Sequence, residues 1–258
     1  MEKMRKKKVP SFLFEIKPEL EDAIDQILIK MENGKIDEVI PQVDALLADN
    51  ADYPLVLYAK GCLLAKQSNP TEAIPFFEEA VRINPVFLEA WANLSLASTK
   101  IMKLPRAAEA AREVLELDKP GSPIYDQAKN FLSTLNEIAR KEGVSVKNYL
   151  GAAVIFDEAL DLMERKDFEG ARDGFMRSYA LNPNVPATLG NLGLCHAYLG
   201  EKTVALEMID KAREINPDYE PARQNRSAIE KLEEGEALSG NFQTINNTLE
   251  TLKNRSEL

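Results

Sequence analysis

The residues able to act as nucleophiles or general bases are few in this chain. It has one histidine, His196, and two cysteines, Cys62 and Cys195. Cys195 and His196 are adjacent, and neighbouring residues of a helix project in different directions, so they cannot act as a nucleophile–base pair. The sequence has no HExxH, GxGxxG or GxxxxGK[ST] motif and no metal-ligand spacing of Cys or His. We therefore expect no enzyme, no catalytic residue, no metal site and no cofactor.

The numerous carboxylates are interpreted as a solvated surface. Asp and Glu number 42 against 32 Lys and Arg, which gives a net charge of −10, and five of the bases fall in the first eight residues. Such an acidic body repels nucleic acid and anionic membranes, so neither is expected as a partner. The basic residues between Lys3 and Lys8, within an expected flexible N-terminus at 1–17, leave an accessory role at nucleic acid or membrane as an alternative.

The cysteines and the apolar segments predict a cytoplasmic protein. Cys62 and Cys195 are isolated and belong to no CxxC pair, which fits a reducing compartment. The apolar segment after the basic start is short and is interrupted by Glu15, so it does not read as a secretory signal. No stretch approaches the roughly 18 consecutive apolar residues of a membrane-spanning helix.

A fixed period organises the chain. Ala73 and Ala107 are 34 residues apart, and so are Ala171 and Ala205. A period of this length is typical of helical repeat proteins. It defines five units, each expected to contain two helices joined by a short turn: 20–53, 54–87, 88–121, 152–185 and 186–219.

Residues at fixed positions of the units resemble the tetratricopeptide repeat family. The family pattern has an aromatic residue near position 4, Leu-Gly at positions 7 and 8, small residues at 20 and 27, a bulky one at 24 and proline at 32. Matching residues in units two to five are Gly61, Ala73, Phe77, Ala80 and Pro85; Trp91, Leu94, Ser95 and Ala107; Phe168, Ala171, Phe175, Ser178 and Pro183; and Leu192, Gly193, Ala205, Ile209, Ala212 and Pro217. Unit three departs from the pattern with Lys119 in place of the proline, and unit one is degenerate.

The resemblance implies an all-α fold, a right-handed α-α superhelix of about five helix-turn-helix repeats. Small residues would lie where helices approach closely, and stacking of neighbouring repeats would bury their apolar faces. Pro41 and Pro75, both at position 22, predict a late start or a bend in the second helices of units one and two.

Residues 122–151 interrupt the period. They predict an inserted helix over 123–141, ended by Gly143, and the start of an extended helix that continues into unit four. The expected organisation is then repeats one to three in 18–121, the insertion in 122–151, repeats four and five with a C-terminal cap helix in 152–234, and a polar tail, with a thin helical stripe, in 235–258.

The resemblance also implies where a partner would bind. In this family the first helices of the repeats line a concave groove, and chaperone-binding members hold a peptide carboxylate there with lysines. Those lysines are missing here, so a carboxylate clamp of the chaperone type is excluded, because the buried charge would be uncompensated. Asparagine recurs at position 6 of the first helix, and an amide can pair with any peptide backbone.

The predicted function is a non-catalytic adaptor that binds a peptide or helix of another protein in the concave groove. The residues expected to contact this partner are Asn93, Phe156, Leu160, Asn191, Leu194, Tyr198 and Asn225. Alternatives stay open: self-association as a homo-oligomer through the apolar groove of units four and five, or a groove filled by helix 123–141 or by the tail at 241–254.

Overall fold

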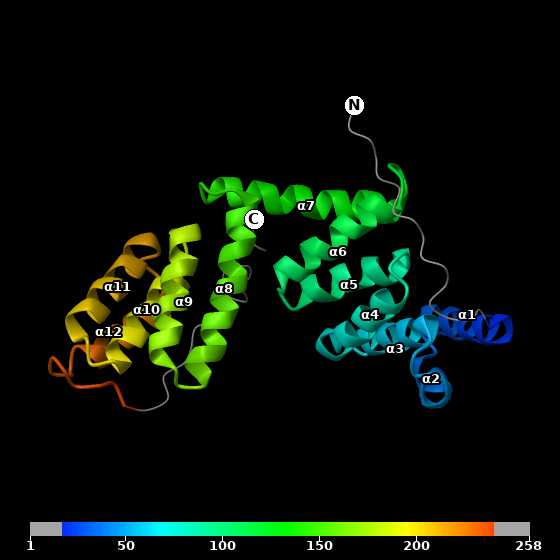
Figure 1. The fold of residues 1–258 in the computed structure, drawn as a ribbon, viewed down its shortest axis with the longest axis horizontal. Helices are drawn as coiled ribbons and strands as arrows, with labels where there is room; N and C mark the ends of the chain where they lie inside the picture. The colour runs from blue at the N-terminus through cyan, green and yellow to red at the C-terminus, as the bar shows by residue number, and fades with distance from the viewer. Residues whose placement is uncertain (1–16, 240–258) are drawn as a thin grey trace. The chain divides into compact units, whose positions relative to one another are not determined.

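A computed structural model describes residues 17–239. This part of the chain is all-α and contains no strand. Its twelve helices are α1 (Pro18–Glu32), α2 (Ile36–Asp49), α3 (Pro54–Lys66), α4 (Pro70–Ile83), α5 (Leu88–Lys100), α6 (Leu104–Leu117), α7 (Pro123–Lys141), α8 (Val146–Glu164), α9 (Phe168–Leu181), α10 (Pro186–Tyr198), α11 (Lys202–Ile215) and α12 (Glu220–Ile229) (Figure 1). The predicted helical hairpins, inserted helix and cap helix are all confirmed.

The chain forms two compact units, Met1–Ser133 and Thr134–Leu258, and the division falls within α7. In the first unit α3 packs on α4, α4 on α5 and α5 on α6. In the second unit α8 packs on α9, α9 on α10, α10 on α11 and α11 on α12. Each unit is thus a stack of helical hairpins, in which α1 to α6 and α8 to α12 contact their neighbours in sequence.

The turn inside each hairpin is the same in both units. Its left-handed residue is Gly34, Ser68, Met102, Lys166 or Gly200, with φ between 62° and 80°. The next residue donates its N–H to the carbonyl five residues earlier, at 2.9–3.0 Å, which closes a Schellman motif. The first three of these residues are 34 apart, as are the last two, so the backbone repeats the period of the alanines.

Close helix contact explains the small residues of the repeat. A Cβ atom on Gly61 would lie 2.6 Å from the ring of Phe77, and one on Gly193 would lie 2.9 Å from the side chain of Ile209. Phe77 and Ile209 are both fully buried. Glycine at position 8 therefore makes room for the bulky residue at position 24 of the same hairpin.

The two interior prolines do not delay their helices. Pro41 and Pro75 lie inside α2 and α4, which begin five residues earlier, at Ile36 and Pro70. The expected late start is therefore wrong, while the alternative, a bend at these prolines, stays a prediction.

Candidate peptide-binding surfaces

Two helices present the same repeat positions in different surroundings. In the first unit, Ala92, Asn93, Leu96 and Thr99 of α5 form what we call the α5 row. In the second unit, Gly190, Asn191, Leu194 and Ala197 of α10 form the α10 row. Each residue of the α5 row has its equivalent 98 residues later in the α10 row, so the two rows occupy the same positions of the repeat.

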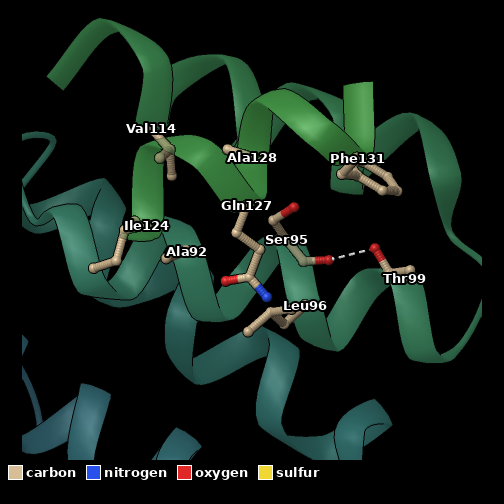
Figure 2. Close-up of a pocket in the computed structure, with 9 residues that line it drawn as sticks. All are labelled: Ala92, Ser95, Leu96, Thr99, Val114, Ile124, Gln127, Ala128 and Phe131. Carbon is tan, nitrogen blue, oxygen red and sulfur yellow. Dashed lines mark hydrogen bonds between the residues drawn. The ribbon is translucent and has the colours of Figure 1, made fainter. Parts of the chain in front are cut away.

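The α5 row borders an open hollow. A cavity of about 200 Å³ lies between α5, α6 and the first half of α7. It is lined by Ala92, Ser95, Leu96, Thr99, Val114, Ile124, Gln127, Ala128 and Phe131 (Figure 2). Leu96 is 41% exposed and is one of several large apolar side chains at the surface of the described residues. The hollow is smaller than the roughly 300–1,000 Å³ of small-molecule pockets, so its size suits one side chain of a partner.

The hydroxyl groups in the hollow are already engaged. Ser95 Oγ donates to the carbonyl of Ala107 at 3.0 Å, and Thr99 Oγ1 donates to the carbonyl of Ser95 at 2.8 Å. The remaining polar group of the lining is the amide of Gln127, which is exposed on α7. The cavity therefore offers an apolar wall with one amide at its edge.

Asn93 contacts the preceding repeat. Its Nδ2 donates to Tyr58 Oη at 3.0 Å and to Cys62 Sγ at 3.5 Å. Burial raises the pKa of the Cys62 thiol to about 11 and raises the pKa of Tyr58 as well. This polar cluster is neutral at physiological pH, and Asn93 is half-buried within it.

The α10 row has no comparable exposure. Leu194 and Asn191 are both 0% exposed, and Gly190 and Ala197 are buried too. The preceding first helix, α8, adds Phe156 and Leu160, which are also buried. These apolar residues belong to one hydrophobic core with Phe175 and Ile209.

Tyr198 and Asn225 flank this core. The Tyr198 ring is stacked on Phe168, with 4.2 Å between centroids and 6° between planes. Asn225 lies on α12, 34 residues after Asn191, and is 6% exposed. Its Nδ2 has no hydrogen-bond partner among the described residues, and a buried donor without an acceptor is costly.

The residues first considered for chemistry are held in structural roles. Cys195 is fully buried, and burial raises the pKa of its thiol to about 12, which disfavours the nucleophilic thiolate. His196 Nδ1 contacts the Glu201 carboxylate at the start of α11. Among residues 17–239, no group of three His, Cys, Asp or Glu side chains is arranged to hold a metal.

The structure groups the predicted contact residues unevenly. Phe156, Leu160, Leu194 and Tyr198 meet in the core of the second unit with Asn191. Asn93 lies in the first unit, next to the α5 row hollow. Sequence reasoning missed the α7 side of that hollow because it treated 122–151 as an insertion. A usable signal existed, since Gln127 lies 34 residues after Asn93.

Two predicted features concern residues outside the described part. The basic terminus, residues 1–16, and the stripe at 241–254 both lie there. None of the helices between residues 17 and 239 combines the length and apolar character needed to cross a bilayer.

Comparison with known proteins gives a family match in the first unit. The family model described as anaphase promoting complex subunit 8 / Cdc23 matches residues 19–119, which is less than half of the chain. No curated protein sequence matches this chain.

Solved structures resemble the chain at low identity. YrrB, described as a TPR protein with an unusual peptide-binding site, is 18% identical over 80% of this chain and 90% of its own, with a TM-score of 0.42. The P58(IPK) TPR domain is 13% identical over 83% and 65%, with a TM-score of 0.44. The yeast Sti1 TPR2AB domain in complex with pHSP90 is 15% identical over 83% of each chain, with a TM-score of 0.41. At these values the likeness carries no inference about function.

The assignment of the repeat type therefore depends on the residues and the backbone conformation of the chain itself. Five helical hairpins have the same 34-residue layout, in one run of three and one of two, and each is closed by the same left-handed turn. Small residues fill the contact positions and bulky ones the space between. With these features in place, the described part of the chain has the helical-hairpin fold and the 34-residue layout of tetratricopeptide repeats.

Proposed function

We propose that this chain is a non-catalytic protein-interaction scaffold whose first unit binds a helix or extended peptide of a partner protein. The observation that carries the proposal is the hollow beside the α5 row. Its apolar lining and its volume of about 200 Å³ suit one large apolar side chain, inserted between α5 and α7. Anchor side chains at protein interfaces commonly fill small apolar pockets of the partner.

Polar groups beside the hollow would orient the partner backbone. Gln127 on α7 presents an amide one repeat after Asn93, and an amide can both donate to and accept from a peptide bond. The lining contains no charged residue, so the favoured anchor is apolar. A peptide carboxylate, as in chaperone clamps, finds no cation among these residues.

Site-specific photocrosslinking tests the proposal. A benzoylphenylalanine probe in place of Leu96 should capture a partner protein from a cell extract. The same probe in place of Met176, which is 52% exposed on α9, is the matched control and should not capture it. Adding Phe131→Asp to the Leu96 probe should abolish capture, because it puts a charge into the apolar wall.

Two outcomes would contradict the proposal. Equal capture at positions 96 and 176 would mean that the hollow has no special affinity. Capture of nothing but further copies of this chain would favour the self-association alternative instead.

A further inference from the structure

A line of residues along α5 ends in charges of opposite sign. Glu89, Asn93, Leu96 and Lys100 are spaced by four, three and four residues, which places them on one side of the helix. We call these four residues the charged stripe. Glu89 and Lys100 are exposed, and Leu96 between them is 41% exposed. With a rise of about 1.5 Å per residue, the two charged residues lie roughly 16 Å apart along the helix axis.

Contacts with α3 place the charged stripe against the preceding repeat. Asn93 donates to Tyr58 and Cys62, both on α3. Burial is the main cause of the raised pKa of Tyr58 and of Cys62. Among the smaller effects, the charge of Glu89 adds to the increase at Tyr58, and the charge of Lys66 opposes the increase at Cys62. Glu89 and Lys66 therefore lie at the two ends of this neutral polar cluster.

Lys66 strengthens the basic end. It is the last residue of α3, as Lys100 is the last residue of α5, and the two are 34 residues apart in the sequence. Because α3 contacts α5 and packed helices are about 8–10 Å apart, both lysines lie at the same edge. Among the described residues neither lysine nor Glu89 forms an ion pair, whereas Arg106 of the same unit is paired with Glu78. The charges at both ends are therefore available to a partner.

This order of charges is not a property of the repeat. The equivalent residues of α10 carry no charge, and those of α1 include three acids: Ala187, Asn191, Leu194 and Tyr198; and Glu21, Asp25, Leu28 and Glu32. Stabilisation of helix ends by basic residues does not explain the pattern either, since α1 and α8 end in Glu32 and Glu164. The acid, the amide, the apolar side chain and the base are thus particular to α5.

We propose that the partner segment carries the complementary order of charges: an acidic residue beside Lys66 and Lys100, an apolar anchor in the hollow, and a basic residue beside Glu89. This inference rests on the proposed function and adds the chemistry and the orientation of the partner. Leu96 is four residues from Lys100 and seven from Glu89, so the acid of a segment lying along α5 is closer to the anchor than the base is.

The charged stripe contributes selectivity more than affinity. Its charges are exposed at the rim of the hollow, where an ion pair adds little binding energy but favours one orientation and speeds the encounter. A side-chain carboxylate at this rim stays in contact with water. It therefore differs from the buried carboxylate of a chaperone clamp, which needs cations inside the groove.

Selection from a random-peptide library displayed on phage tests the proposal, with the full-length chain as the target. The enriched peptides should share a large apolar residue, with Asp or Glu within one helical turn on one side and Lys or Arg on the other. Lys66→Glu/Lys100→Glu should replace that acid by a base. Lys119→Glu/Lys129→Glu makes the same change of net charge at exposed residues outside the lining and the charged stripe, and should leave the preference unchanged.

One enriched peptide then gives the size of the effect. Replacing its acidic residue by the corresponding amide should weaken binding about two- to fivefold at low salt, as expected for an exposed ion pair. Raising the salt to about 0.5 M should remove the difference, because exposed charges are then screened. Fluorescence anisotropy of the labelled peptide measures both dissociation constants.

The outcomes separate this inference from the proposed function. Apolar anchors without flanking charges, or the same acid preference in Lys66→Glu/Lys100→Glu, would overturn this inference and leave the proposed function standing. A selection without enriched peptides, or peptides that bind Phe131→Asp equally well, would contradict the proposed function itself and this inference with it.

Discussion

The α5 row and the α10 row occupy identical repeat positions and differ in exposure. Leu96 is 41% exposed beside an open hollow, whereas its equivalent, Leu194, is 0% exposed. Both helices have 13 residues and both precede the same left-handed turn, at Met102 and Gly200. The difference therefore does not arise from the repeat itself.

The two rows have different neighbours. The α5 row meets α7 across the hollow, which Ile124 and Phe131 also line (Figure 2). The α10 row belongs to a core with residues of α8, α9 and α11, and Leu238 donates its N–H to the carbonyl of Ala197 at the end of α10. The same repeat positions are thus partly exposed in one unit and buried in the other.

Truncating the two equivalent leucines should give the largest contrast. Leu194→Ala removes a fully buried side chain and should lower the free energy of unfolding by about 2–5 kcal/mol. Leu96→Ala should change it by less than about 0.5 kcal/mol, because the side chain is largely exposed. Urea denaturation of the two variants measures both changes in free energy. Similar decreases in stability would show that the two leucines are buried to the same extent in solution.

The two native thiols should react slowly and with a marked pH dependence. Because burial raises the pKa of Cys62 to about 11, its thiolate is scarce at neutral pH. Against a free thiol of pKa about 8.5, alkylation at about pH 8 should be roughly a hundredfold slower, rising about tenfold per pH unit up to about pH 10.

Cys195 supplies the comparison within the second unit. It is fully buried and its thiol pKa is raised to about 12, so it should react more slowly than Cys62 at every pH. Single Cys→Ser variants separate the two signals by mass spectrometry. Faster labelling of Cys195 would show that the α10 helix is open in solution.

Position 8 provides a smaller contrast. Gly193→Ala places a Cβ 2.9 Å from Ile209 and 3.0 Å from the carbonyl of Ala205, so it should cost about 1–3 kcal/mol. Ser95→Ala removes the hydrogen bond to Ala107 without crowding and should cost about 1 kcal/mol. Thermal unfolding ranks the two variants, and the reverse order would show that α10 and α11 are not in close contact.

The hairpin turns should respond equally in both units. Met102 and Lys166 adopt left-handed backbone conformations, with φ of 62° and 63°, which side chains disfavour and glycine tolerates. Met102→Gly and Lys166→Gly should each raise the free energy of unfolding by up to about 1 kcal/mol. Unequal gains in the free energy of unfolding, measured by urea denaturation, would show that the hairpin turns of the two units differ in backbone conformation.

The sequence predicted the positions of the helical hairpins better than the exposure of the residues on them. The 34-residue spacing of the alanines is enough to place the hairpins, because close packing demands small residues at those positions. The spacing gives no information on whether a concave residue is exposed. Leu96 and Leu194 have the same residue type and register, yet one is 41% exposed and the other is buried in a core with residues of neighbouring helices. Met102 and Lys166 show a similar limit, since neither residue type announces a left-handed turn.

The central claim is that the α5 row is accessible while the equivalent α10 row is buried. Thiol labelling of Leu96→Cys and Leu194→Cys, in a chain whose two native cysteines are replaced by serine, tests it most directly. The account predicts rapid labelling at position 96 and labelling at least roughly tenfold slower at position 194, because burial protects the thiol. Equal labelling rates at the two positions would contradict it.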